Sequence, residues 1–541
     1  MNRKKTLGII LIIAACIVTL AVIIVLFVFP NSSNTSDPDK KSNGTGGGTV
    51  HLADDHTEFS GDGAETEGSR ITIKKAGTYE IDGTLNNGQI RVKAGTGDSI
   101  TLVFNNVTIT NPDREAVYIK EAGAVSIELK EGTVNTVCSG SVPEQILSDD
   151  TLFSAENETA LSQAAAALNP DDSAKRAAVY SKGDLTVNGT GKLRVFGYIK
   201  NGIQAKNKLA INGGEFQIMA RNHGMKGNAS FYMENAAAFI VAGNDGIHSD
   251  AVAELGNGDG DCTIYAQDDG IQTGQAIRVK GGGLNVLHSD EGLEANQIEI
   301  SGGTLDLTAD DDGMNACTAD EETNEDTFPN LKISGGTVKI HAGGDGLDSN
   351  GNLLVSGGEV TIDGPSDDGN SALDSGSENN GTCKINGGTV IAIGSSGMAE
   401  GFSESSGQCS FLYNGKERWE EGTTLDITDE KGNSLCQYVT KKTANSIVFS
   451  SPELKKGNRY TLQITDSAGK KTTETIEQES VSVSAGEPSR MGGGMGKGGA
   501  PRPDKKPGQG NDHWQKGEKP PSGTFPGGAP PDQARDFSSQ N

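Results

Sequence analysis

A short phrase recurs at nearly constant spacing between residues 180 and 398, and it limits the fold more than any other feature of the 541-residue chain. An acidic or amide residue, once replaced by histidine, precedes a glycine that is usually followed by an aliphatic residue. The copies are Asn201-Gly202-Ile203, His223-Gly224-Met225, Asp245-Gly246-Ile247, Asp269-Gly270-Ile271, Glu291-Gly292-Leu293, Asp312-Gly313-Met314, Asp345-Gly346-Leu347 and Asp368-Gly369. Successive glycines are 22, 22, 24, 22, 21, 33 and 23 residues apart. A fixed period of this length is typical of repeat architectures.

Pairs of apolar residues spaced by two fill the sequence between the glycines. Three such pairs occur in each repeat, as in Leu293/Ala295, Ile298/Ile300 and Leu305/Leu307. A spacing of two is the period of a β-strand with one buried face, and the helical pattern i, i+3, i+4, i+7 is missing. The sequence therefore predicts an all-β, three-sided parallel β-helix, in which each repeat forms one coil.

Acidic residues recur beside the repeated glycine, so stacking of the coils would align them about 4.8 Å apart. Aligned carboxylates repel each other unless they are solvated or neutralised. Calcium takes six to eight oxygen ligands and is the cation we expect there. The predicted metal ligands are Asp245, Asp268, Asp269, Asp290, Glu291, Asp310, Asp311, Asp312, Asp345, Asp367 and Asp368. The alternative is that Asp and Gly are simply good turn formers, with Asp capping its own backbone.

A second outward row is predicted two residues after each glycine. Its members, the predicted ligand-binding residues, are Gln204, Lys226, His248, Gln272, Glu294, Asn315 and Asp348. Such side chains would form a flat hydrogen-bonding strip suited to sugar hydroxyls, and calcium could also hold uronate carboxylates. Exposed aromatic residues are scarce in the regular repeats, where Tyr232 and Tyr265 are the nearest candidates. This scarcity favours an acidic polysaccharide over crystalline cellulose.

The rest of the chain divides by composition. Residues 1–30 contain an apolar stretch, Leu7 to Phe29, preceded by Arg3, Lys4 and Lys5. This predicts a single-pass membrane anchor with the body on the extracellular side, and a lipoprotein anchored at Cys16 is the alternative. The predicted domains are the anchor 1–30, a flexible linker 31–67, the β-helix 68–410 with a helical insertion at about 140–178, a C-terminal β cap 411–480 and a disordered tail 481–541.

The chain is strongly acidic, with a net charge of −27. Such a body should repel nucleic acid and attract cations. The expected partners are therefore a polysaccharide and, through the anchor, a membrane, with no nucleic acid. We expect a monomer.

Several motifs together resemble a known family. They are the opening Ile71-Thr72-Ile73 with Gly77-Thr78-Tyr79, the phrase from Ala178 to Gly189, the repeated Ser/Asn-Gly-Gly-Thr turns and the Asp-Gly-Ile/Leu repeats. Over residues 68–475 the chain resembles bacterial extracellular carbohydrate-binding proteins built on a right-handed, calcium-containing parallel β-helix with a pectate-lyase-like scaffold. The resemblance implies binding of plant-type polysaccharides such as cellulose or pectin. It also implies calcium at Asp268, Asp269, Asp290, Glu291, Asp310, Asp311 and Asp312. The sequence departs from the pattern at Asn201 and His223, where the acid is missing.

Two other functions remain as alternatives to simple binding. A calcium-dependent polysaccharide lyase would need a Lys or Arg base beside the calcium. The outward row offers only Lys226, with Lys206 and Lys208 in the preceding repeat. A structural surface stalk or adhesin would need no site at all. We expect a polysaccharide-binding protein rather than an enzyme.

Overall fold

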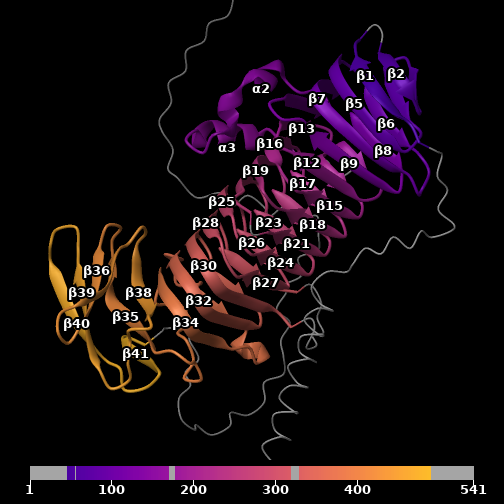
Figure 1. Ribbon diagram of the computed structural model, residues 1–541. Helices are drawn as coiled ribbons and strands as arrows, with labels where there is room; N and C mark the ends of the chain where they lie inside the picture. The colour runs from indigo at the N-terminus through magenta and orange to yellow at the C-terminus, as the bar shows by residue number, and fades with distance from the viewer. Residues whose placement is uncertain (1–44, 55–56, 170–176, 257, 319–327, 489–541) are drawn as a thin grey trace, which may run out of the picture. The chain divides into compact units, whose positions relative to one another are not determined.

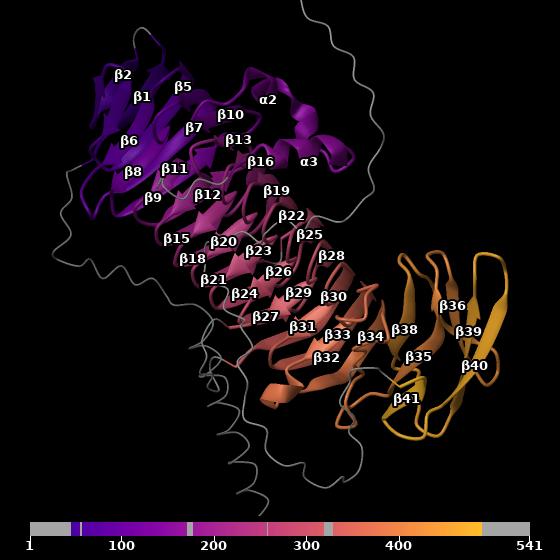
Figure 2. The ribbon, with the colours of Figure 1, turned by 180° about the vertical axis from the view of Figure 1, so that it is seen from behind.

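The computed structural model describes residues 45–54, 57–169, 177–256, 258–318 and 328–488. Most of these residues form strands of long sheets, as Figures 1 and 2 show from opposite sides. Among the described residues, one sheet has thirteen strands. In spatial order they are β3 (Ala64–Glu67), β4 (Arg70–Ile73), β6 (Gln89–Lys93), β8 (Val117–Glu121), β11 (Ala177–Ser181), β14 (Asn201–Ala205), β17 (Met225–Gly227), β20 (Ile247–Ser249), β23 (Ile271–Thr273), β26 (Leu293–Ala295), β29 (Met314–Ala316), β31 (Leu347–Ser349) and β33 (Leu373–Ser375).

A larger sheet of twenty-four strands contains two further rows of parallel strands, counted over the same described residues. One row follows β9 (Ala124–Leu129), β12 (Leu185–Gly189), β15 (Lys208–Ile211), β18 (Ser230–Met233), β21 (Val252–Leu255), β24 (Ala276–Val279) and β27 (Gln297–Ile300). The other follows β10 (Val134–Ser139), β13 (Lys192–Gly197), β16 (Gly214–Ala220), β19 (Ala236–Ala242), β22 (Asp261–Ala266), β25 (Gly283–His288) and β28 (Thr304–Ala309).

Four long strands join these two rows into one sheet. They are β7 (Ser99–Asn111), β30 (Asn330–Ala342), β32 (Asn352–Asp363) and β34 (Cys383–Gly394). β7, for example, pairs with β9 through its first half and with β10 through its second half. Each regular coil thus contributes three strands, such as β20, β21 and β22, and each strand pairs in parallel with its equivalent one coil away. The predicted all-β fold built on long parallel sheets is confirmed.

The interior of the coils is a single apolar core. The inward members of the sequence pairs, such as Leu293, Ile298 and Leu305, are fully buried. Cys262 and Cys383 also belong to this core, where a thiol acts as a small apolar residue. Stacking of aliphatic residues between three sheets removes them from water, which is the main stabilising term in folding.

The recurring glycine is required by the close approach of neighbouring coils. A Cβ atom on Gly292 would lie 2.3 Å from the carbonyl oxygen of Gly313 in the next coil, and one on Gly313 would lie 2.6 Å from that of Gly346. Because these neighbours are backbone atoms, a side chain could be accommodated only by separating the coils. The sequence period therefore marks the positions where backbones of successive coils touch.

Both ends of the stack differ from the predicted boundaries. The predicted linker 31–67 contains β1 (Gly47–Leu52), β2 (Glu58–Asp62) and β3, so residues 47–54 and 57–67 are part of the folded body. β1 pairs in parallel with β5 (Gly77–Leu85) and antiparallel with β2, which covers the first coil. The linker prediction was wrong there because Val50 and Leu52 are buried within a segment that is otherwise rich in Gly, Thr and charged residues.

At the other end, antiparallel strands follow the last coil. β38 (Ala444–Ser450) pairs with both β34 and β35 (Ser410–Trp419), and β35 pairs with β41 (Ser482–Gly486). A separate sheet has the order β37 (Ser434–Val439), β36 (Thr424–Asp429), β39 (Arg459–Thr465) and β40 (Lys471–Glu477). The β cap is thus present, but β41 extends it into the segment predicted to be a disordered tail. Residues 489–541 lie outside the described residues.

The insertion contains the predicted helix. It forms α2 (Glu144–Ser148), the 3₁₀ turn η1 (Asp150–Phe153) and α3 (Glu158–Ala166). Rather than projecting freely, α3 buries Leu161 and Ala165 in an apolar cluster with Phe196, Met219 and Val241 of the row β13, β16 and β19. The insertion therefore covers an outer face of the coils, as Figure 1 shows.

The predicted single-pass location at the cell membrane is corrected by this structure. Across the residues that it describes, no helix has both the length and the apolar character needed to cross a bilayer. The anchor 1–30 and the alternative lipid site at Cys16 lie outside those residues. The membrane location is therefore not carried further.

Candidate functional site

One face of the thirteen-stranded sheet carries an uninterrupted row of outward side chains, which we call the outward row. Its neighbours are set residue by residue by the parallel pairing. The row is Thr72, Arg91, Tyr118, Tyr180, Gln204, Lys226, His248, Gln272, Glu294, Asn315, Asp348 and Asp374. All seven residues predicted as ligand-binding are aligned in it, in the predicted order.

A second row lies at the turn before the same strands, and we call it the acid row. The backbone N–H of each recurring glycine from Gly202 to Gly346 donates to the carbonyl oxygen of the acid-row residue one coil further on. This chain of hydrogen bonds fixes the row as Asn201, His223, Asp245, Asp269, Glu291, Asp312, Asp345 and Ser371. Asp268, Asp290 and Asp311 form a parallel flanking row, because Asp290 N donates to Asp268 O and Asp311 N donates to Asp290 O.

Side chains of the acid row also connect successive coils. Asn201 Oδ1 accepts from His223 N at 3.2 Å, Asp269 Oδ1 from Glu291 N at 3.3 Å and Asp312 Oδ1 from Asp345 N at 2.6 Å. An acidic or amide residue thus caps the backbone of the next coil rather than its own backbone. The recurrence of an acidic or amide residue before the glycine is therefore partly explained by this hydrogen bond between coils, without a bound metal.

Two groups of three carboxylates bring the rows together. One is Asp269, Glu291 and Glu294; the other is Asp312, Asp345 and Asp348. In each group, one oxygen from every residue lies within 4.8 Å of the others. A third group, Asp245, Asp268 and Asp269, shares Asp269 with the first. Carboxylates that the sequence repeat predicted to be aligned therefore lie close together in the structure.

Burial and mutual repulsion dominate the electrostatics of these groups. Burial, followed by neighbouring carboxylates, raises the pKa of Asp345 to about 8, although a hydrogen bond from the Ser371 backbone opposes the shift. Burial likewise raises the pKa of Glu291 to about 7 and that of Asp312 to about 6. The pKa of Asp269 is raised well above its ordinary value, first by burial. A bound cation would oppose these shifts, because its positive charge favours the ionised carboxylates.

The donor set suits a hard cation. All six residues in the two carboxylate groups offer oxygen, the ligand atom that calcium prefers. Between Glu294 and Asp348 in the outward row lies Asn315, whose Oδ1 is buried and has no hydrogen-bond partner among the described residues. A buried acceptor without a donor is destabilising, so a cation beside it would satisfy an otherwise costly group.

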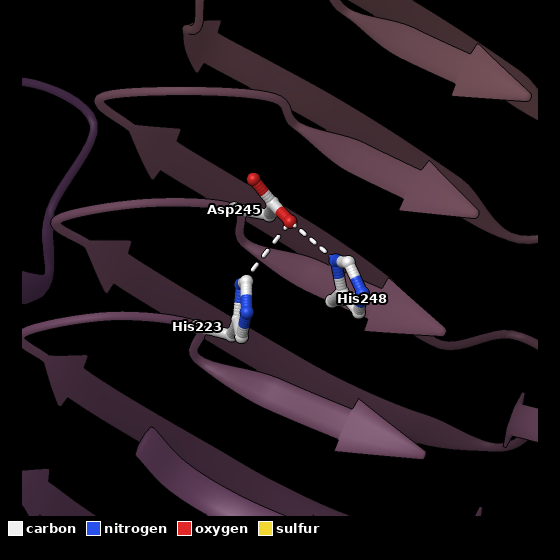
Figure 3. Close-up of side chains that lie close together, drawn as sticks. All are labelled: His223, Asp245 and His248. Carbon is white, nitrogen blue, oxygen red and sulfur yellow. Dashed lines mark hydrogen bonds and ion pairs between the residues drawn. The ribbon is translucent and has the colours of Figure 1, made fainter. Parts of the chain in front are cut away.

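A cluster of different chemistry is formed by two histidines and one aspartate, His223, Asp245 and His248, which Figure 3 shows. Asp245 is fully buried, and its Oδ2 lies 3.1 Å from His223 Nδ1 and 2.6 Å from His248 Nδ1. Burial alone would raise the pKa of Asp245, but hydrogen bonds from the two histidines hold it below its usual range. Burial lowers the pKa of His223. Unlike the two carboxylate groups, this cluster places a carboxylate next to two imidazole nitrogens, His223 Nδ1 and His248 Nδ1.

Other predicted metal ligands are placed elsewhere. Asp310 is largely exposed, with its Oδ1 3.8 Å from His288 Nδ1. Asp367 and Asp368 lie outside the acid row, because Ser371 and Asp374 occupy the equivalent positions in the last coil. Asp368 instead pairs with Arg418 of β35 at 2.9 Å. The predicted alignment of Asp367 and Asp368 with the acidic repeat was wrong, because Asp368-Gly369 matches the sequence phrase without matching its position.

Sequence reasoning missed five members of the outward row, which are Thr72, Arg91, Tyr118, Tyr180 and Asp374. Asp374 aligns with Asp348, and the shared triplet Leu-Asp-Ser at 347–349 and 373–375 was the available signal. Tyr118 and Tyr180 stack with ring centroids 5.9 Å apart and extend the row beyond Gln204. The tyrosines proposed from sequence do not belong to this row. Tyr265 is buried in the apolar cluster under the insertion, and Tyr232 lies in β18 beneath Lys208.

A family model described as "Carbohydrate-binding domain-containing protein" matches residues 67–316 and 324–487. A protein of that description from Acetivibrio thermocellus is 33% identical over 159 residues, which are 29% of this chain and 48% of the relative. The chain thus spans about half the length of this curated relative.

A solved structure described as the polysaccharide lyase-like protein from C. thermocellum, a gadolinium derivative, was also found. It is 22% identical and covers 59% of this chain and 91% of its own, with a TM-score of 0.27. The family match extends over most of the coils and the β cap, including the whole of both carboxylate groups. The chain belongs to the family of carbohydrate-binding domain-containing proteins.

Proposed function

We propose that this protein binds an acidic, plant-type polysaccharide along the outward row, with calcium held by the carboxylate groups beside it. The observation that carries the proposal is the alignment of the outward row with two groups of converging, mostly half-buried carboxylates on one face of the coils. Membership of a carbohydrate-binding family supports the class of ligand.

Calcium would be held by Asp269, Glu291 and Glu294 at one site and by Asp312, Asp345 and Asp348 at the other. When bound, it would neutralise the buried carboxylates and offer open positions to a uronate carboxylate. Around it, Gln272 and Asn315 supply amide groups to sugar hydroxyls, because they occupy the outward row beside these acids. Stacked coils present these groups at a regular spacing, which suits a polymer of repeated units.

The end of the outward row that contains Tyr118 and Tyr180 is aromatic and basic rather than acidic. Tyr118 and Tyr180 continue it without a break, and Arg91 lies over the Tyr118 ring at 5.9 Å. A guanidinium can pair with a uronate carboxylate through two hydrogen bonds. A polymer that spans from Arg91 to the carboxylate groups would therefore meet a cation at one end and calcium at the other. Pectin fits this arrangement better than uncharged cellulose.

Binding without cleavage is the proposed mode of action. A lyase would need a free base next to the calcium, whereas Lys226 Nζ lies 3.3 Å from Asp250 Oδ1. Lys226 is also aligned with His248 and not with either carboxylate group. The base considered from sequence is thus engaged in an ion pair away from the proposed calcium.

Retention of the protein on immobilised polygalacturonate and on cellulose, with calcium or with chelator, tests the proposal. We expect calcium-dependent retention on polygalacturonate that chelator weakens at least tenfold, and no rise in ultraviolet absorbance from unsaturated uronates. The double variant Asp312→Asn/Asp345→Asn should lose the calcium dependence. Glu359→Gln is the matched control, because Glu359 is an exposed carboxylate on β32. Equal retention in chelator would contradict the calcium sites, and absence of retention on any polysaccharide would favour a structural stalk.

A further inference from the structure

The centre at His223, Asp245 and His248 differs in chemistry from the carboxylate groups. His223 and Asp245 hold acid-row positions in neighbouring coils, and His248 is the outward residue of the Asp245 coil. The two imidazole rings stack with centroids 4.3 Å apart. Both Nδ1 atoms face the same oxygen of Asp245, as Figure 3 shows. Three ligand atoms therefore converge on one point between two coils.

His223 Nδ1 faces two polar neighbours, the amide of Asn244 and the carboxylate of Asp245. Asn244 Nδ2 donates to Asp245 Oδ1 at 3.1 Å, which fixes the orientation of the amide. The same Nδ2 lies 3.4 Å from His223 Nδ1, which would have to be unprotonated to accept from it. That Nδ1 is also 3.1 Å from Asp245 Oδ2, an acceptor. Without a metal, His223 Nδ1 can either accept from the amide or donate to the carboxylate, but it cannot do both at once. A metal ion between His223 Nδ1 and Asp245 Oδ2 would bind both atoms.

His248 is oriented from its far side. Its Nε2 lies 3.3 Å from Asp250 Oδ1, and Asp250 is held in turn by Asn228 Nδ2 at 2.7 Å and Lys226 Nζ at 3.3 Å. A histidine that donates its outer N–H to a carboxylate presents the other nitrogen as a lone pair, which is the usual arrangement around metal-ligating histidines. His248 Nδ1 lies 2.6 Å from Asp245 Oδ2, to which it can donate when no metal is bound. A metal ion that takes the place of this proton would be bound by both atoms.

We propose that His223 Nδ1, Asp245 Oδ2 and His248 Nδ1 bind a divalent transition ion of the zinc class. Two imidazoles and one carboxylate are a common ligand set for zinc, and calcium is a poor match because it takes oxygen ligands. Zinc bonds of about 2.0–2.1 Å place neighbouring ligand atoms roughly 3.3 Å apart, so only small side-chain rotations are needed. Three protein ligands leave a fourth position for water or a ligand oxygen. This site shares no ligand with the proposed calcium sites, although Asp245 lies next to Asp269 of the first of them.

Titration of the purified full-length protein, first treated with chelator and then dialysed, with zinc chloride in a calorimeter tests this site. We expect one tight zinc site that millimolar calcium does not displace, and visible absorption bands when cobalt is used instead of zinc. His223→Ala and His248→Ala should each weaken zinc binding at least 100-fold. Asp250→Asn leaves all three ligands in place and should weaken it 10- to 100-fold through the orientation of His248.

His51→Ala is the matched control, because His51 Nδ1 lies 2.6 Å from Asp82 Oδ1 but has an exposed side chain. This variant should bind zinc as the wild type does, and so should Asp345→Asn, which alters a proposed calcium site only. Circular dichroism and melting curves in chelator establish that each variant is folded. Wild-type affinity in both folded ligand variants, or displacement of zinc by equimolar calcium, would overturn the proposal. Failure of polysaccharide binding would not affect it.

Discussion

The carboxylate of Asp312 accepts a hydrogen bond from the backbone N–H of Asp345, one coil further on, at 2.6 Å. The same Asp345 belongs with Asp312 and Asp348 to a group of converging carboxylates. A residue that joins two coils is therefore also a candidate ligand for a cation. This double role explains why acids persist at a position where an amide, as at Asn201, also connects the coils.

We predict that stability in the absence of metal falls as pH rises. The pKa values of Asp345, Glu291 and Asp312 are raised to about 8, 7 and 6 in the folded state. Because the unfolded values are about 4, the folded state binds these protons more tightly. Their stabilisation is complete below about pH 4 and is lost as pH rises through these folded pKa values. In chelator, the melting temperature should be at least ~2 °C lower at pH 8.5 than at pH 5.

Calcium should reverse this dependence, because it takes over the role of the protons. Melting curves at pH 8.5 with and without calcium provide the comparison, and magnesium serves as the control ion. A melting temperature in chelator that is unchanged or higher at pH 8.5 would contradict the electrostatic account of the carboxylate groups.

Asp345→Asn should separate the two roles of this residue. The amide oxygen can still accept from the Ser371 backbone N–H, but the buried negative charge is removed. In chelator at pH 8.5 we expect the variant to be at least as stable as the wild type, because repulsion within the carboxylate group is relieved. Its gain in melting temperature on adding calcium should be reduced by half or more. Glu359→Gln, which removes an exposed charge, should leave that gain intact.

The coils were predictable from sequence for a definite physical reason. Gly292 and its equivalents lie where backbones touch, so the spacing of glycines follows the spacing of coils. In the last coil Ala372 replaces the glycine, and β33 is the final strand of its sheet among the described residues, so no further strand of that sheet follows it. The glycine repeat in the sequence therefore stops one coil before the last coil of the structure. Asp368-Gly369 was mistaken for the copy of the phrase that belongs to that last coil.

The ends of the outward row and the histidine centre were less accessible to sequence reasoning. Tyr118 and Tyr180 are adjacent in the sheet but are separated by the helical insertion, so no repeat spacing relates them. The convergence of His223 and His248 depends on side-chain orientations across two coils, which a list of repeat positions does not contain. Alignment along the rows was predictable, whereas contacts between the rows were not.

Gly292→Ala should destabilise the protein by about 1–3 kcal/mol, the usual cost of overpacking. The new Cβ would lie 2.3 Å from the Gly313 carbonyl oxygen, a backbone atom that cannot rotate away. Urea denaturation followed by circular dichroism measures the change. Gly183→Ala is the control, because a Cβ there meets nothing within 4 Å. Equal stability of the two variants would show that the coils do not approach as closely as the glycine row requires.

Leu161→Ala should cost about 2–5 kcal/mol of the free energy of unfolding, which is typical of a buried leucine. Leu161 is fully buried between α3 and the apolar cluster that contains Phe196 and Met219, so its loss would leave a cavity against the coils. Ala160 of the same helix is only partly buried, and Ala160→Gly is the control that tests helix propensity alone, at about 1 kcal/mol. Urea denaturation of both variants distinguishes the two effects. A cost for Leu161→Ala no larger than that of the control would mean that the insertion is not firmly packed on the coils.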